Sequence, residues 1–199
     1  MSGRRKAIYA VGVLLLIVAG AALWLFGPAL LPPENIDAGI AKGEQAPIAM
    51  SLRDPTGKPT TLAEQMGEKG MVLLLVRSAD WCPFCKAQLA RSEQIREALE
   101  ADGYALASLS YDEPPRLAAF AAENELGYVM LSDKGSKMID ALDLRDPQYE
   151  EGSYAWGVPY ASILVLAPDG TVLTKFVSED YRSRLSNEDV KAMVKRVAD

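Results

Sequence analysis

The stretch that decides the fold is Met71-Val72-Leu73-Leu74-Leu75-Val76-Arg77-Ser78-Ala79-Asp80-Trp81-Cys82-Pro83-Phe84-Cys85. Its apolar run is typical of a strand that is buried on both faces, and we expect this strand to span 71–77. The segment that follows, 86–101, carries apolar residues at helical spacing. The sequence therefore predicts a buried strand, a turn that holds two cysteines, and a helix that begins at those cysteines.

Cys82 and Cys85 are the only cysteines of the chain. On the first turn of a helix, residues three apart lie close enough to form a disulfide. Free N–H groups and the helix dipole stabilise a thiolate at a helix N-terminus. We therefore predict a redox-active dithiol in which Cys82, with a lowered pKa, is the nucleophile and Cys85 is the resolving thiol. The alternatives are half of a metal site shared between subunits and a structural disulfide, which would stabilise little because its loop is so short.

The composition excludes several other kinds of site. The chain has no histidine, which removes Ser-His-Asp and Cys-His catalysis and histidine-ligated metals. Two cysteines cannot form a four-thiolate metal site. Three of the 21 Lys and Arg residues precede Glu34, so the remainder carries 18 cations against 27 acidic residues. Such an acidic domain repels phosphates. We predict no metal, no cofactor and no nucleic-acid partner.

The N-terminal part of the chain has the features of a membrane anchor. Residues 7–27 contain no charge and are long enough to cross about 30 Å of hydrocarbon as a helix. The positive charges in 1–6 favour a cytoplasmic N-terminus, so we predict that the rest of the chain lies on the extracytoplasmic (periplasmic) side of the cell membrane, with 28–43 as a linker. A cleaved signal peptide is the alternative, although its apolar core is usually about 7–15 residues long.

Strands and helices alternate through the predicted domain, 44–199. Pro168-Asp169-Gly170 is typical of a tight turn, so the last two strands form a hairpin. Asn187 is the predicted N-cap of the last helix. This order predicts an α/β fold with a mixed central sheet flanked by helices. The predicted strands are 48–52, 71–77, 104–110, 129–131, 161–166 and 171–177, and the predicted helices are 60–68, 86–101, 114–123, 136–142 and 188–198.

Over residues 44–197 the sequence resembles the thioredoxin superfamily. The resemblance rests on Trp81-Cys82-Pro83-Phe84-Cys85 after an apolar strand and on Gly157-Val158-Pro159 before another. It implies a thioredoxin-like fold, a cis peptide bond at Pro159, and a substrate site formed by Trp81, Val158 and Pro159. The stretch 43–57 resembles the redoxin branch, which holds membrane-tethered thiol–disulfide oxidoreductases and peroxiredoxin-like alkyl hydroperoxide reductase/thiol-specific antioxidant proteins.

The sequence departs from this family at two positions where relatives carry a buried acid. Val76 stands where thioredoxin has an aspartate, and Gln88 stands where several tethered relatives have a glutamate. An evident proton acceptor for Cys85 is therefore missing. Asp80 is near Cys82 in sequence, but it is also typical of an exposed turn.

A peroxiredoxin-like thiol peroxidase is the second functional hypothesis. Such enzymes have Thr or Ser three residues before the peroxidatic cysteine, a proline upstream and an arginine elsewhere. Ala79 is three residues before Cys82, with Ser78 one residue out of register, and Cys82 itself is three residues before Cys85. The arginine could be Arg77 or Arg145, so the peroxidase motif is incomplete.

Four aromatic residues surround the Gly-Val-Pro element: Tyr149, Tyr154, Trp156 and Tyr160. They could line a groove for a protein substrate or pack a long loop onto the core. Our first functional hypothesis is a membrane-anchored thiol–disulfide oxidoreductase that exchanges electrons with protein thiols and a partner redox protein. A non-catalytic thioredoxin-fold binding module is the third hypothesis, and the two intact cysteines argue against it.

Overall fold

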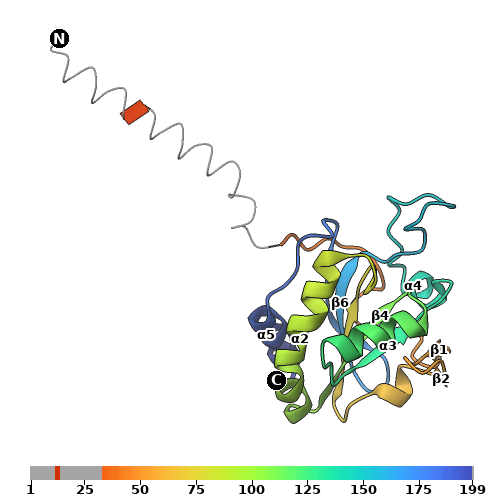
Figure 1. Ribbon diagram of the computed structural model, residues 1–199. Coiled ribbons are helices and arrows are strands. Elements are labelled where there is room, and N and C mark those ends of the chain that lie inside the picture. Colours follow the sequence, from red (N-terminus) through yellow and green to blue (C-terminus); the bar gives the residue numbers. More distant parts are fainter. Residues whose placement is uncertain (1–11, 14–32, 199) are drawn as a thin grey trace. The chain divides into compact units, whose positions relative to one another are not determined.

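The computed structural model describes residues 12–13 and 33–198 (Figure 1). The predicted cytoplasmic segment 1–6 and nearly all of the predicted anchor 7–27 lie outside the described residues. In the part of the chain that is described, no helix combines the length and the apolar character needed to cross a membrane. The chain divides into two compact units, Met1–Pro33 and Glu34–Asp199. The second unit contains both cysteines.

A seven-stranded sheet forms the centre of this second unit, with the strand order β2-β1-β5-β4-β3-β6-β7. The sheet is mixed, as the sequence predicts, because three central strands are parallel and both of its edges are antiparallel. The parallel strands are β3 (Gly70–Leu75), β4 (Tyr104–Ser110) and β5 (Val129–Ser132); the others are β1 (Leu52–Arg53), β2 (Pro59–Thr60), β6 (Ala161–Leu166) and β7 (Val172–Ser178).

Helices cover the sheet on both faces. The helices α2 (Pro83–Ala101), α3 (Pro114–Glu123) and α5 (Asn187–Ala198) pack on one face, where Figure 1 shows them side by side. The short helix α4 (Lys137–Ala141) covers the other face together with apolar residues from 36–50. The result is the mixed sheet flanked by helices that the sequence predicts, arranged as the resemblance to the thioredoxin superfamily implies.

The central strand β3 contributes to both cores, which explains why its sequence is apolar without interruption. Val72 and Leu74 pack toward α2, whereas Leu73 and Leu75 pack on the opposite face. Every residue of β3 is buried. Successive side chains of a strand point to opposite faces, so a strand covered on both sides needs an apolar residue at every position.

The parallel pairing of β3 and β4 determines where the cysteines lie. Leu75 pairs with Leu109, so the two strands end at the same edge of the sheet. The turn that follows β3 leads into α2, and the residues that follow β4 lie beside that turn. Residues distant in sequence therefore meet at the first turn of α2.

The N-terminal boundary of the compact unit differs from the sequence prediction. The N–H of Ile36 donates to the carbonyl of Val177 at 2.9 Å, and the Lys175 ammonium donates to the carbonyl of Ala38 at 2.8 Å. These contacts fix 34–43 onto β7, although the sequence assigns these residues to the linker 28–43. Residues 34–43 contain no proline and show little periodicity, and an edge interaction made mostly by backbone atoms leaves no pattern in the sequence.

Two predicted helix boundaries also differ. The segment 60–68 contains only the 3₁₀ turn Ala63–Gln65 (η1), which is followed by extended backbone at Met66. At the last helix, the Ser186 hydroxyl accepts from the N–H of Asp189 at 3.1 Å, and the Asp189 carboxylate accepts from Ser186. Ser186, rather than the predicted Asn187, therefore caps α5.

Replacing Leu164 tests the two-sided burial of the central strands. Leu164 is fully buried on β6 opposite Leu73. Leu164→Ala should lower the free energy of unfolding by about 2–5 kcal/mol, because it leaves a cavity in a closed core. The measurement is urea unfolding followed by circular dichroism. Leu173→Ala on β7, where the leucine is only partly buried, is the matched control and should cost less than half as much; equal losses would contradict this packing.

Candidate active site

The two cysteines lie at the first turn of α2. Cys82 is the N-cap of the helix, and its Sγ accepts a hydrogen bond from the N–H of Cys85 at 3.3 Å. Pro83 occupies the first helical position, where its missing N–H leaves no donor unused. Cys82 and Cys85 form a disulfide with their Cα atoms 5.3 Å apart. The structure is thus the oxidised form of the predicted dithiol, and the helix keeps its first turn in this form.

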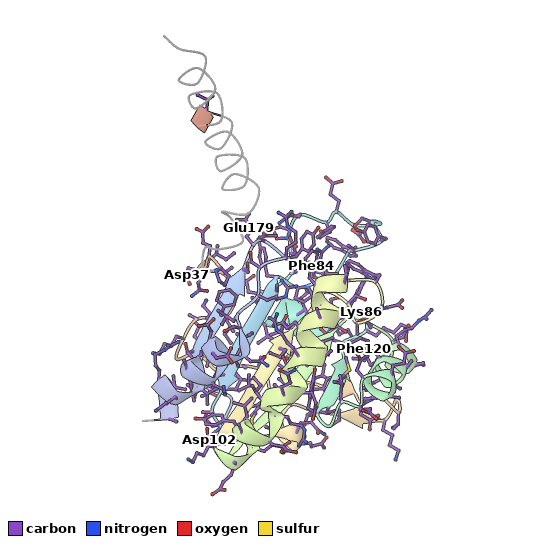
Figure 2. All side chains as sticks on the ribbon, turned by 60° about the vertical axis from the view of Figure 1, so that its left-hand side comes forward. Asp37, Phe84, Lys86, Asp102, Phe120 and Glu179 are labelled. Carbon is purple, nitrogen blue, oxygen red and sulfur yellow. A yellow bond between two sulfur atoms is a disulfide. The ribbon has the colours of Figure 1, made fainter. Side chains whose placement is uncertain are left out.

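Both cysteines are almost inaccessible to solvent, with exposed fractions of 1% for Cys82 and 0% for Cys85. Phe84 lies between them and is 40% exposed. Figure 2 shows Phe84 at the start of α2 and Asp102 at its opposite end. The disulfide is therefore buried, although the aromatic residue between its two cysteines is exposed.

A buried carboxylate holds the turn that leads to Cys82. Asp112 is the second residue after β4. Its carboxylate accepts three hydrogen bonds: from the Ser78 hydroxyl at 2.8 Å, the N–H of Ala79 at 2.7 Å and the Ser110 hydroxyl at 2.8 Å. The Ser78 hydroxyl in turn accepts from the N–H of Trp81 at 3.2 Å. Asp112 therefore connects the end of β4 to the residues just before the cysteine motif.

Asp112 is a buried acid beside the cysteine turn, whereas the two positions that carry one in relatives are Val76 and Gln88 here. Burial raises the pKa of Asp112, and its three hydrogen bonds act in the opposite direction. Gln88 is buried, and its Oε1 has no hydrogen-bond partner among the described residues. Sequence reasoning missed Asp112 because it follows a different strand from the one that leads to the cysteines. The available signal was its place just after the predicted strand 104–110, at the carboxyl end of that strand.

A guanidinium contacts the inner cysteine. Nη2 of Arg184, in the loop between β7 and α5, lies 3.6 Å from Sγ of Cys85. Burial, together with the charges of Arg91 and Arg77, lowers the pKa of Arg184 to about 10. The group is still protonated at neutral pH. Arg184 was not a candidate from the sequence, since it stands about a hundred residues after Cys85 in a segment without a motif.

Arg77, one of the two predicted candidate cations, is also at the site. Its side chain is 2% exposed. The guanidinium carbon lies 4.1 Å from the centre of the Tyr181 ring, 4.8 Å from that of Tyr149 and 5.1 Å from that of Trp81. It also donates a hydrogen bond to the Tyr149 hydroxyl. Cation–π contacts of this kind are attractive and stronger when desolvated.

The other candidate charges lie elsewhere. Arg145 binds the carboxylate of Asp140 with two hydrogen bonds of 2.5 and 2.6 Å, and it stacks on Trp156 at 4.4 Å. Asp80 is exposed, with its carboxylate 3.7 Å from Arg116. Both therefore act as surface ion pairs in this structure.

Aromatic side chains enclose the motif. Trp81 contacts Tyr154 edge to face at 5.3 Å, and its indole N–H donates to the Tyr111 hydroxyl at 3.0 Å. Phe84 contacts Tyr181 at 5.8 Å. Tyr154 is 76% exposed. The predicted aromatic cluster is thus divided: Tyr149 and Tyr154 reach the site, whereas Trp156 stacks on Arg145.

The Gly-Val-Pro element differs from the family expectation. No cis peptide bond occurs among the described residues, so the predicted cis bond at Pro159 is wrong for this structure. The Val158 carbonyl accepts from the N–H of Asp146 at 2.9 Å, and the Val158 N–H donates to Ala155. Pro159 forms a β-bridge with Arg145. Because both backbone groups of Val158 are engaged within the chain, neither is free to pair with a substrate in this form.

Comparison with known proteins assigns the family. The sequence profile of the AhpC/TSA family matches residues 43–175, which is more than half of the chain. The chain belongs to the AhpC/TSA family. This confirms the redoxin resemblance of the cysteine strand and of 43–57.

Among curated relatives, the chain is similar to chloroplastic peroxiredoxin Q of Gentiana triflora, with 29% identity over 61% of this chain and 58% of the relative. It is also 32% identical to chloroplastic peroxiredoxin Q of Populus jackii over 53% and 48% of the two chains. The chain thus spans about half the length of these relatives.

Solved structures share the fold at lower identity. Peroxiredoxin Q of Xanthomonas campestris superposes with a TM-score of 0.64 at 20% identity, covering 82% of this chain and all of that one. Reduced Prx3 of Vibrio vulnificus in complex with H2O2 gives a TM-score of 0.67 at 20% identity, covering 79% and 99%. These similarities extend over nearly the whole compact unit.

The raised pKa of Asp112 gives a pH-dependent stability. Because its pKa is higher in the folded than in the unfolded chain, its contribution is fully present below about pH 4 and is lost as the pH rises through the folded value. Asp112→Asn does not titrate. The stability advantage of the wild type over Asp112→Asn should therefore shrink from pH 4 to pH 7, measured by urea unfolding. An advantage that grows toward pH 7 would show that the hydrogen bonds to the carboxylate outweigh its burial.

Proposed function

We propose that this chain is a peroxiredoxin-type thiol peroxidase that reduces hydroperoxides with its Cys82/Cys85 couple. The observation that carries the proposal is the contact between Arg184 and Sγ of Cys85. Membership of the AhpC/TSA family and the peroxiredoxin names of the relatives support it. In this proposal the second hypothesis from the sequence takes precedence over the first.

The contact favours Cys85 as the thiol that attacks the peroxide. A partly buried guanidinium beside a sulfur stabilises the thiolate, which is the nucleophilic form. The same cation can stabilise the negative charge that develops on the departing oxygen. The resemblance places a Thr or Ser hydroxyl three residues before the peroxidatic cysteine, and here Cys82 has that place. This assignment is the reverse of the sequence prediction, in which Cys82 attacks.

The proposed reaction has two steps. The Cys85 thiolate attacks the terminal oxygen of ROOH, the O–O bond breaks, and ROH leaves after taking a proton; Cys85 becomes a sulfenic acid. The Cys82 thiol then attacks this sulfur and releases water, which gives the observed disulfide. The Cα atoms are already 5.3 Å apart and α2 begins at Pro83 in the oxidised form, so the second step needs no unwinding of the helix.

Thiol–disulfide exchange with protein partners is the second candidate function. It is favoured by the position of Cys82 as N-cap, where its sulfur accepts the N–H of Cys85. The two functions use the same dithiol and differ in the oxidant. A membrane anchor at 7–27 and an extracytoplasmic location remain part of the proposal; protease treatment of intact cells, which should cleave the domain only if it is exported, tests them.

Mapping the oxidised cysteine decides between the two assignments. Cys82→Ser should react once with H2O2 and accumulate a sulfenic acid on Cys85, because no resolving thiol remains. Cys85→Ser should not react at an appreciable rate. Dimedone labelling and mass spectrometry provide the measurement. Sulfenic acid on Cys82 of the Cys85→Ser variant would instead support the sequence prediction, in which Cys82 is the nucleophile.

Removing the guanidinium should slow the peroxide step. Arg184→Gln should lower the second-order rate constant for peroxide by about 10–100-fold, the loss expected when a charged hydrogen bond to the reacting group disappears. Stopped-flow tryptophan fluorescence follows the reaction, since Trp81 is next to Cys82. Arg182→Gln is a matched control in the same loop, since Arg182 is exposed and pairs with Asp180; it should change the rate less than twofold. Equal effects of both variants would remove the support for this role of Arg184.

A further inference from the structure

Three arginines converge beside the disulfide without a carboxylate partner. Arg77, Arg91 and Arg184 form no ion pair within 4 Å among the described residues. Their charges act on one another, since Arg91 and Arg77 both lower the pKa of Arg184. Each of the three also has a buried Nε without a hydrogen-bond partner. Arg77 is buried, and Arg91 and Arg184 are partly buried. Partly desolvated cations without a carboxylate partner are the composition of an anion site.

Two acidic residues act on this cluster electrostatically but are engaged elsewhere. Asp180 accepts hydrogen bonds from the backbone N–H and the Nε of Arg182, each at 3.0 Å. Asp146 accepts from the N–H of Gln148 at 3.0 Å. Their charges offset part of the positive potential, but neither carboxylate forms an ion pair with Arg91 or Arg184 among the described residues. Nη1 of Arg184 donates to the carbonyl of Ser183 at 2.9 Å, so an anion would share these guanidiniums with neutral acceptors only.

The redox state decides when an external anion is needed. In the reduced protein the Cys85 thiolate supplies a negative charge to Arg184. In the disulfide form Cys85 carries no charge, so the positive charges of the three arginines have no anion beside them. A ligand that carries an anionic group therefore gains most by binding the oxidised protein, and the substrate that must bind the oxidised protein is its reductant.

We propose that Arg91 and Arg184 bind the carboxylate of a small thiol that reduces the Cys82–Cys85 disulfide. This proposal deepens the peroxidase function and rests on it for the source of the disulfide. A planar guanidinium matches a carboxylate with two parallel hydrogen bonds, which makes a carboxylate a better fit than a neutral group. Arg91 is suited to the role because Nη2 donates to the carbonyl of Leu185 at 2.7 Å, which fixes its side chain against the loop that carries Arg184.

The burial of the disulfide favours a small reductant over a protein. The two cysteines are 1% and 0% exposed, and Phe84, which lies between them in the sequence, packs against Tyr181. A redox protein would have to displace the side chains that cover the disulfide to bring its own cysteine into contact with Sγ. A small thiol needs a narrower opening.

The reduction consumes two thiols. A thiolate RS⁻ attacks Sγ of Cys82, the Cys82–Cys85 bond breaks, and Cys85 leaves as a thiolate next to Arg184. A second thiolate attacks the sulfur of R in the mixed disulfide, forms RSSR and releases the Cys82 thiolate, which takes a proton from water. Two thiols are oxidised and one disulfide is reduced. A stabilised leaving thiolate accelerates the first step, which is why Cys82 is the attacked sulfur.

The test compares matched thiols on the oxidised full-length protein. 3-Mercaptopropionate and 6-mercaptohexanoate are each paired with their methyl ester, and the rates of disulfide reduction are expressed per thiolate. The acids should react about 10-fold faster than the esters despite the negative charge of the domain. The chain length with the larger ratio reports how far the carboxylate site lies from the sulfur. Equal rates for acid and ester at both lengths would overturn the proposal.

Substitutions of single arginines test which residue causes the preference for acids over esters. Arg91→Gln should reduce the acid-to-ester ratio to near one, whereas Arg96→Gln, which removes the same charge from the same helix but from a group paired with three glutamates, should keep it. A ratio unchanged in Arg91→Gln would overturn the site. Propionate tests the site without a mutation. It should competitively inhibit the reduction of the disulfide by the mercapto acids and leave the reduction by their esters unaffected. Equal inhibition of both reactions would contradict the proposal.

The two half-reactions separate this proposal from the peroxidase function. If the reduced wild type is not oxidised by any hydroperoxide, the peroxidase function fails, while the thiol comparison on chemically oxidised protein still stands. A carboxylate-bearing hydroperoxide and its ester are compared on the reduced protein as well. If only the oxidation step prefers the acid, the arginines bind the carboxylate of the hydroperoxide. The proposal that they bind the reductant would then be wrong.

Discussion

The hydrogen bonds of the Asp112 carboxylate are the constraint on which the site depends. They connect the end of β4 to Ser78 and Ala79, which lead into the cysteine turn. A turn at the edge of a sheet has many conformations of similar energy, and three short hydrogen bonds from a buried acceptor select one of them. Cys82 can then cap α2, and Cys85 falls one turn further in. Burying the charged Asp112 carboxylate costs desolvation free energy, and the raised pKa of this group reflects that cost.

The second requirement is a cation at the inner sulfur. Arg184 comes from the loop between β7 and α5, and its position depends on the loop being closed over α2. The hydrogen bond from Arg91 to Leu185 and the bond from Asn187 to the carbonyl of Arg91 at 2.8 Å provide this closure. The fold thus brings the start of α2 next to the loop that leads into α5, and the two cysteines have different surroundings. Cys82 caps the N-terminus of α2, whereas Cys85 contacts the guanidinium of Arg184.

The sequence was sufficient for the fold and for the dithiol. A strand buried on both faces and a helix with one buried face leave distinct patterns in a sequence. The uninterrupted apolar run of β3 therefore has few other interpretations, and the same holds for the helical spacing of apolar residues after Cys85. The family resemblance added the redoxin branch, which the comparisons confirm. Each of these predictions relies on local patterns or on a contiguous motif.

The remaining features of the site depend on contacts between distant residues. Asp112 and Arg184 lie on other elements, and nothing in their local sequence distinguishes them from surface charges. The expected cis bond at Pro159 came from the family and not from this chain, where Val158 is hydrogen-bonded to Asp146 and Ala155. The expected cation Arg145 pairs with Asp140, and Arg77 is at the site for a reason that composition does not reveal, namely three aromatic rings around one guanidinium.

The central claim is that Arg184 makes Cys85 the more reactive thiol. The direct measurement is the rate of iodoacetamide alkylation of each cysteine in the reduced protein as a function of pH, resolved by mass spectrometry of the peptides. We expect Cys85 to ionise at a lower pH than Cys82, and Arg184→Gln to remove the difference. Ionisation of Cys82 at the lower pH in the wild type would contradict this claim and would assign the nucleophile to the helix N-cap.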